Sequence, residues 1–293
     1  MKRIIPLLIA ALALTACAAK NETTAEIPEM MPLVEQQLAF GPRTPGSEAH
    51  DNFVTWACGI LNDAGWETTA ETKTYQGKPV RNIIAERSSG DSKTGKWILL
   101  GAHYDSRLQS DQDVTNFKWD ATPGAEDGAS GVAVLLALAE SLPESENVSV
   151  TLAFFDAEDQ GNLMGWPDWC LGSSLLAEEY AAAGTLPDEV IILDMVGDSD
   201  LNIYREGNSD PEMMDTLFTI AAELGLSDKF INKEKYRMTD DHMPFINLGI
   251  PAVDLIDFDY PYWHKTTDTA DKLSEESLRA VYKVVYEYLV NSQ

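Results

Sequence analysis

Acidic residues and two of the four histidines recur at the ends of apolar segments, and these residue types hold metals and move protons. Histidine nitrogens and carboxylate oxygens are the usual ligands of a catalytic zinc, which keeps one coordination position open for water or substrate. In an adjacent acidic pair, one carboxylate can bind the metal while the other transfers protons. Each segment taken alone is also typical of a turn or a helix cap, so only the occurrence of all the segments in this order indicates a functional site. The segments are residues 101–106, 124–131, 154–159, 193–197 and 263–264.

Strand and helix patterns alternate along the chain and place these segments. Strands are predicted at residues 80–85, 97–101, 148–155, 190–196 and 251–256. Helices are predicted at residues 31–40, 50–64, 132–141, 169–182, 211–224 and 274–290. Largely apolar strands separated by helices favour a single α/β domain, with a mostly parallel twisted sheet covered by helices on both faces. Because ligands bind outside the carboxyl ends of such strands, the five segments are expected to converge on one site.

The motifs in this order carry a family resemblance. They are residues 39–43, 156–159, 169–172, 193–197, 239–242 and 262–264, besides the His-x-Asp and Asp-Gly-x-Ser-Gly sequences that precede the acidic pair. The chain resembles the zinc aminopeptidase superfamily. Within it, the chain is most similar to the glutaminyl-peptide cyclotransferases of the animal and Bacteroidetes-like type. The resemblance covers residues 38 to 290 and implies a zinc-aminopeptidase-like fold.

The resemblance also implies a metal site. A single zinc would be held by Asp127, Asp159 and His264, and Glu158 would be the general acid and base. One departure concerns the ligands, because Asp159 stands where animal members carry glutamate and its side chain is one methylene shorter.

Further residues are implied around that zinc. Asp194 and Asp240 would belong to the hydrogen-bond network of the acid/base residue. Trp263 matches the tryptophan of the family's substrate pocket, and Trp166 lies near the place of a second pocket aromatic. Asp254 stands where animal members have a histidine in the proton network, so that part of the network is not carried over.

Two reactions are known on this scaffold, and the zinc ligands alone do not separate them. His103 and Asp194 would bind a second zinc in an aminopeptidase, which would hydrolyse N-terminal residues of peptides. Aminopeptidases typically read Ser-Asp-His where this chain has an additional acid, Asp240, in the sequence Asp-Asp-His. The expected activity is therefore conversion of an N-terminal glutamine of peptides to pyroglutamate with release of ammonia, using one zinc.

The cyclase hypothesis has a consequence for the protonation of the acidic residues at the site. Crowded carboxylates repel one another as anions, so at least one of Glu158, Asp194 and Asp240 should have a raised pKa and hold a proton near neutral pH.

A third hypothesis is a non-catalytic binding lipoprotein, in which the enzyme fold has lost its catalytic residues. It is disfavoured because every expected ligand type and Glu158 are present.

Composition limits the partners of the chain. Its 293 residues include 48 acidic and 21 basic side chains, for a formal net charge of −27. Nucleic acid is excluded as a partner because phosphate contacts need a basic face. The expected partners are the N-termini of peptides or proteins, bound as substrates.

The N-terminus predicts export. Lys2 and Arg3 precede an apolar run at residues 4–14, as in a secretory signal peptide covering residues 1–16. The sequence Leu-Thr-Ala-Cys resembles a bacterial lipobox, in which Cys17 would be lipidated, while plain signal cleavage is the alternative. Residues 17–30 would then be a lipid-anchored tether to a catalytic domain at residues 31–293. The expected location is periplasmic or outer-membrane associated, with the lipid anchor as the only membrane contact.

Besides Cys17, the chain has two cysteines. Cys58 and Cys170 both lie in apolar surroundings and are expected to pack as small reduced residues. Two cysteines make no disulfide framework, although an exported protein could join them.

Overall fold

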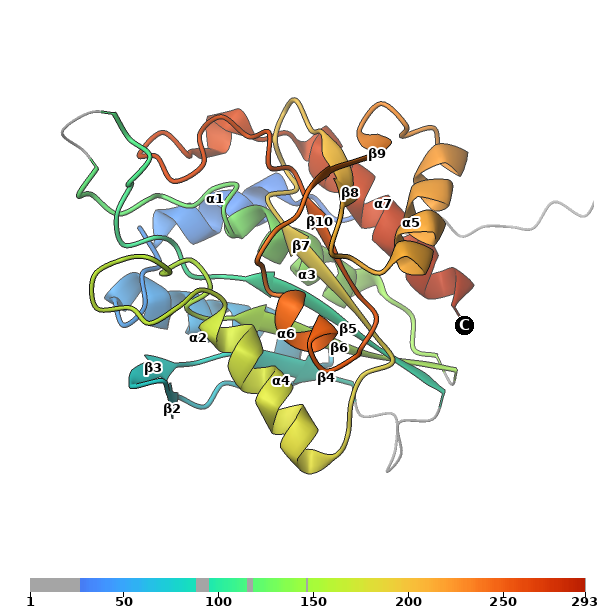
Figure 1. The fold of residues 1–293 in the computed structure, drawn as a ribbon, viewed down its shortest axis with the longest axis horizontal. Coiled ribbons are helices and arrows are strands. Elements are labelled where there is room, and N and C mark those ends of the chain that lie inside the picture. Colours follow the sequence, from blue (N-terminus) through green and yellow to red (C-terminus); the bar gives the residue numbers. More distant parts are fainter. Residues whose placement is uncertain (1–26, 88–94, 115–117, 146, 293) are drawn as a thin grey trace, which may run out of the picture.

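The computed structural model describes residues 27–87, 95–114, 118–145 and 147–292, and a six-stranded sheet forms its centre (Figure 1). Across the sheet the strands are β1 (Glu67–Thr69), β4 (Ile83–Glu86), β6 (Val148–Phe155), β5 (Lys96–His103), β7 (Glu189–Asp194) and β10 (Ala252–Ile256). The last four run parallel, whereas β4 is antiparallel to β6 and to β1. The predicted α/β class is confirmed, and the sheet is mixed because of this antiparallel edge.

Helices cover both faces of the sheet (Figure 1). They are α1 (Met31–Ala39), α2 (Glu48–Asp63), α3 (Ala129–Ser141), α4 (Leu171–Ala183), α5 (Pro211–Glu223), α6 (Met243–Ile246) and α7 (Glu275–Asn291), with a 3-10 turn at Ala270–Lys272. Side chains of β5 alternate between the faces: Ile98 and Leu100 pack with α3 and α7, and Leu99 packs with α4 and α6. Both faces of the sheet are therefore apolar, which explains the unbroken apolar runs in the sequence.

The structure corrects the strand predicted at residues 80–85. A hairpin of β2 (Lys73–Tyr75) and β3 (Lys78–Val80) ends before β4 begins. Between them, the Arg81 amide donates to Asp156 Oδ2, and the Asn82 side chain binds both Asp156 N and Gly172 O. These side-chain bonds replace ladder bonds, so the strand is interrupted. A second two-stranded sheet, β8 (Ile203–Glu206) with β9 (Phe230–Tyr236), was also not predicted.

The helix predicted at residues 169–182 starts later than expected. Cys170 has a φ of +55°, a left-handed conformation, and α4 begins only at the next residue. Both Cys58, half-buried, and Cys170, buried, are free thiols, as expected.

The N-terminal predictions fall largely outside the described residues. The signal peptide at residues 1–16 and Cys17 are not among them. Of the segment at residues 17–30, Met30 is fully buried, and its amide donates to Glu275 Oε2, so packing of the domain starts before residue 31. Within the described ranges, no helix combines the length and apolar character needed to cross a membrane.

Two glycines in helices are expected to respond oppositely to alanine. A Cβ atom at Gly131 in α3 would lie 2.1 Å from the carbonyl oxygen of Leu193, the residue before Asp194. Gly131→Ala is expected to lower the free energy of unfolding by about 1–3 kcal/mol, because the helix must move off the sheet. A Cβ atom at exposed Gly59 in α2 would meet nothing within 4 Å. Gly59→Ala is therefore expected to raise the free energy of unfolding by about 0.5–1 kcal/mol. Urea unfolding measures both, and equal effects would contradict the close packing of α3.

Candidate active site and metal centre

The carboxyl ends of β5, β6 and β7 lie together at one edge of the sheet. Strands β5 and β7 end on predicted site residues, and the acidic pair lies just beyond β6. The loops before α3 and after β10 bring the remaining two residues to the same edge. The side chains that meet there are His103, Asp127, Glu158, Asp159, Asp194 and His264. The predicted convergence of the five segments is confirmed.

Asp127, Asp159 and His264 form a buried group whose ligand atoms lie within 4.8 Å of one another. His264 Nε2 lies 2.9 Å from Asp159 Oδ1 and 3.6 Å from Asp127 Oδ2. The Oδ2 atoms of both aspartates find no hydrogen-bond partner among the described residues. Buried carboxylate oxygens without partners are costly, so this donor set fits a bound cation, and one nitrogen with two oxygens suits zinc.

The protonation of His264 agrees with this interpretation. Burial lowers the pKa of His264, but the carboxylates of Asp159 and Asp111 outweigh burial and raise the pKa to about 9. The carboxylates thus hold a positive charge on the ring at neutral pH. A divalent cation in the same place would displace that proton, as metal binding to histidine generally does.

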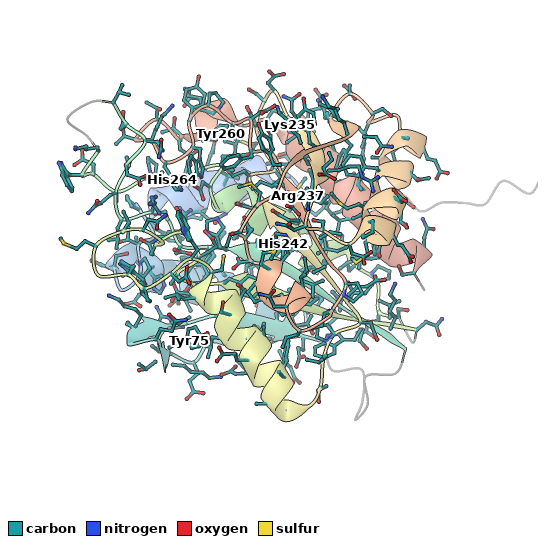
Figure 2. All side chains as sticks on the ribbon, viewed as in Figure 1. Tyr75, Lys235, Arg237, His242, Tyr260 and His264 are labelled. Carbon is teal, nitrogen blue, oxygen red and sulfur yellow. The ribbon has the colours of Figure 1, made fainter. Side chains whose placement is uncertain are left out.

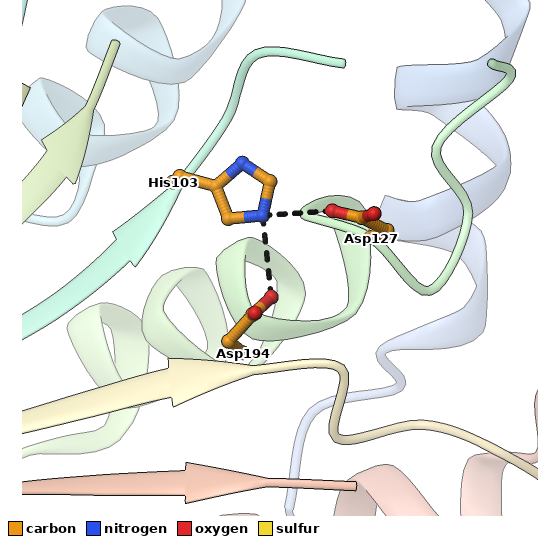
Figure 3. A group of neighbouring side chains, drawn as sticks. All are labelled: His103, Asp127 and Asp194. Carbon is orange, nitrogen blue, oxygen red and sulfur yellow. Dashed lines mark hydrogen bonds and ion pairs between the residues drawn. The ribbon is translucent and has the colours of Figure 1, made fainter. Parts of the chain in front are cut away.

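A second group shares Asp127 with the first (Figure 3). His103 Nε2 lies 3.1 Å from Asp127 Oδ1 and 3.2 Å from Asp194 Oδ1. On the other side of the ring, His103 Nδ1 is 3.5 Å from Asp105 Oδ1. The donors for a second cation are therefore in place beside the first group.

Glu158 points into the site from just beyond β6. Its carboxylate accepts a hydrogen bond from the Cys170 thiol, with Sγ 3.2 Å from Oε1, and its amide donates to Asp105 Oδ1. Burial raises the pKa of Glu158 well above its usual range, and repulsion from Asp240 adds to the rise. A buried carboxyl with a raised pKa that lies beside the metal group is suited to general acid/base work, because it takes up a proton more readily than an ordinary glutamate does.

Further acids lie behind Glu158. Burial and then repulsion from Asp194 raise the pKa of Asp240 to about 8, which confirms the expected proton-holding carboxyl. Ligand atoms of Asp240, His242 and Asp254 lie within 4.8 Å of one another, and His242 directly precedes α6 (Figure 2). Asp254, where animal members have histidine, is thus placed beside Asp240 in the same acidic network.

The site opens into a cavity of about 190 Å³ that is lined by acidic, aromatic and aliphatic side chains. Its lining comprises Asp127, Glu158, Asp159, Trp169, Asp194, Met195, Met238, Thr239, Asp240, Ile256, Phe258, Trp263 and His264. Trp263 stacks on His264 with ring centroids 3.6 Å apart, and Trp169 lies nearly parallel to the same ring at 6.0 Å. Trp263 therefore lies where the sequence placed it.

The structure does not bring Trp166 to this cavity. Its ring packs beside the small apolar cluster of Val80, Ala157 and Leu171, with Lys78 Nζ 4.5 Å from the ring centroid. Its assignment to substrate binding stays a prediction. Trp169 supplies the second aromatic wall, although the sequence offered it only as part of a family motif.

Four of the six non-glycine residues with positive φ in the described ranges lie at this site. They are Ala157, Cys170, Met195 and His264, with φ between 47° and 56°. Ala157 precedes Glu158, and Met195 follows Asp194. A left-handed conformation is unfavourable for such residues and persists only where surrounding contacts over-determine it. The backbone that presents these candidate site residues is thus held in place by its neighbours.

Comparison with known proteins defines the class. The model of Peptidase family M28 matches residues 82–289, so the chain belongs to this peptidase family. A glutaminyl-peptide cyclotransferase of Drosophila melanogaster is 24% identical over 287 residues, covering 85% of this chain and 78% of the relative. The structure of Porphyromonas gingivalis glutaminyl cyclase is 31% identical, with a TM-score of 0.82, covering 90% of this chain and 98% of that one. A Zn-dependent exopeptidase from Parabacteroides distasonis is 29% identical, with a TM-score of 0.83, covering 90% and 99%.

These relatives confirm the resemblance drawn from the motifs and include both cyclases and an exopeptidase. Both kinds share the fold of this chain over nearly their whole length. The choice between the two reactions therefore depends on the residues of the site.

Proposed function

We propose that this protein is a zinc-dependent glutaminyl-peptide cyclotransferase, which converts N-terminal glutamine of peptides to pyroglutamate and releases ammonia. The observation that carries the proposal is the buried carboxyl of Asp240. It lines the same cavity as Glu158, and burial and repulsion from Asp194 raise its pKa to about 8, so the cavity contains a second carboxyl that can hold a proton near neutral pH. The cyclases among the relatives support the same reaction.

A zinc bound by Asp127, Asp159 and His264 would act as a Lewis acid on the γ-amide carbonyl of the substrate. Glu158 accepts a proton from the α-amine as that nitrogen forms a bond to the γ-carbon. It then returns the proton to the departing amide nitrogen, and the carbon–nitrogen bond breaks to release ammonia. The nucleophile belongs to the substrate, so the reaction needs no activated water.

The walls of the cavity favour a folded substrate. Trp263 and Trp169 flank the reaction centre, and Phe258 stacks edge-on against Trp263 with centroids 5.1 Å apart. Cyclisation requires the α-amine to approach the side chain of the same residue. A cavity with aromatic walls that holds this folded form raises the effective concentration of the two reacting groups.

A Gln-initiated peptide tests the proposal directly. We expect the purified protein to convert it to a product that is lighter by one ammonia, measured by mass spectrometry. A product that has lost its first residue would contradict the cyclase proposal and favour the aminopeptidase. The aminopeptidase remains the second candidate because His103, Asp127 and Asp194 form a second donor group next to the first.

We also propose that the protein is an exported lipoprotein anchored through Cys17, with peptides or protein N-termini outside the cytoplasm as its substrates. The apolar run at residues 4–14 and the sequence before Cys17 support this. Cys17→Ser is expected to move the protein from the membrane fraction of bacterial cells to the soluble fraction. Immunoblotting of both fractions measures this, and an unchanged membrane fraction would argue against the anchor.

A further inference from the structure

The loop after β5 contains a buried arginine, Arg107, whose side chain contacts the backbone of Asp159, a proposed zinc ligand from a distant part of the sequence. Arg107 is 1% exposed. Its Nη1 donates to the carbonyl oxygen of Asp159 at 2.8 Å, and Nη2 donates to the carbonyl oxygen of Gly161 at 3.1 Å. Nη1 also lies 3.4 Å from Asp159 Oδ1. The guanidinium therefore fixes the backbone that presents one of the three proposed zinc ligands.

The remaining donors of Arg107 hold Asp111. Nε and Nη2 donate to Asp111 Oδ1 at 3.0 Å and Oδ2 at 2.8 Å, a two-point contact that fixes the plane of the carboxylate. Asp111 Oδ1 also lies 3.1 Å from His264 Nδ1. One carboxylate thus links the buried arginine to the histidine of the metal group.

This contact determines which nitrogen of His264 is available to a metal. When Nδ1 carries the proton and donates it to Asp111, Nε2 carries the lone pair. Nε2 is the atom that faces Asp159 and Asp127. A carboxylate on the far nitrogen also makes a ligating histidine more basic and fixes its ring orientation.

The same loop holds the backbone at His264. The Gln112 amide donates to the carbonyl oxygen of His264 at 3.2 Å. Asp113 Oδ2 accepts from the Thr266 amide at 3.0 Å and from its hydroxyl at 2.6 Å. His264 has a φ of +55°, and contacts on both sides of it supply the constraint that this conformation needs.

We infer that Arg107 and Asp111 form a positioning pair for the zinc site, which fixes Asp159 through its backbone and His264 through its ring. Neither residue is a zinc ligand or lines the cavity. The inference rests on the zinc site of the proposed function and is independent of whether the reaction is cyclisation or hydrolysis.

Zinc affinity tests the pair. Asp111→Asn keeps the shape of the side chain but removes the charge that faces His264 Nδ1. Competition with a chromogenic chelator is expected to show zinc affinity reduced about 10–100-fold, the usual effect of losing such a partner. The matched control is Asp215→Asn, since Asp215 pairs with Arg205 at 2.7 Å on the protein surface. The control is expected to bind zinc as the unaltered protein does.

A second variant and a spectroscopic measurement separate positioning from folding. Arg107→Lys keeps the buried charge but loses the two-point contact, and is expected to weaken zinc binding as well. In the Co²⁺-loaded protein, both variants are expected to shift the visible absorption bands, because the ligand geometry changes. Urea unfolding of the metal-free Asp111→Asn protein is expected to show only a modest loss of stability, since the Asp111 side chain is 35% exposed and asparagine can still accept a hydrogen bond from Arg107.

The outcomes distinguish this inference from the function it rests on. Zinc affinity of Asp111→Asn within twofold of the unaltered protein would overturn the positioning role and leave the cyclase proposal intact. An equal loss of zinc affinity in the control Asp215→Asn would overturn the positioning role in the same way. So would a loss of stability in the metal-free Asp111→Asn protein that is large enough to account for its weaker zinc binding. An unaltered protein that binds no zinc would overturn both the inference and the proposed function.

Discussion

Glu158→Gln is expected to lower kcat by about 10²–10⁴-fold, the usual contribution of a positioned acid/base. Glutamine has nearly the same shape and still accepts the hydrogen bond from Cys170, but it cannot take up and return a proton. The effect should appear in kcat, because the group acts mainly in the transition state. Zinc content and KM are expected to stay close to those of the unaltered protein, since Asp159 and not Glu158 belongs to the metal group.

The control for this variant is Glu140→Gln, which removes one negative charge from an exposed position on α3. Its kcat is expected to be unchanged. Near-normal kcat in a zinc-loaded Glu158→Gln protein would remove Glu158 from the mechanism. The proton transfer would then fall to Asp194 or Asp240, the cavity acids outside the group of Asp127, Asp159 and His264.

Removal of zinc with a chelator is expected to abolish turnover of the Gln-initiated peptide, and added Zn²⁺ is expected to restore it. The Oδ2 atoms of Asp127 and Asp159 are buried without hydrogen-bond partners in the described part of the chain, so both oxygens are available to ligate a cation. Mg²⁺ is expected to restore little of the turnover. It prefers oxygen ligands in octahedral geometry, whereas the proposed zinc ligands include the nitrogen of His264.

Metal analysis completes this experiment. A content near one zinc per active chain is expected for the cyclase, since its reaction needs no metal-activated water. A content near two would indicate that His103, Asp127 and Asp194 are also occupied and would favour the aminopeptidase. Full turnover by protein shown to be free of metal would contradict a zinc-dependent mechanism altogether.

The sequence by itself determined the fold class, the strands of the parallel part of the sheet and the position of most chemical groups. Apolar periodicity is a local property, and the strand at Val148–Phe155 was predicted with the bounds that it has. Parallel strands bring their carboxyl ends to one edge, so His103, Glu158 and Asp194 could be expected to meet before any contact was known. The family resemblance placed Asp240 beside Glu158 and Asp194, and the crowding of these carboxylates then predicted that at least one of them has a raised pKa.

Only the tertiary structure decided which aromatic and polar neighbours complete the site. Trp166 and Trp169 lie in one loop, and the fold turned only Trp169 toward His264. Arg107 and Asp111 resemble an ordinary ion pair four residues apart, and nothing in their spacing points to Asp159 or His264. Such contacts join segments that are far apart in the sequence, and they depend on packing and loop conformation. Local residue preferences do not encode them, so these residues had to be found in the folded molecule.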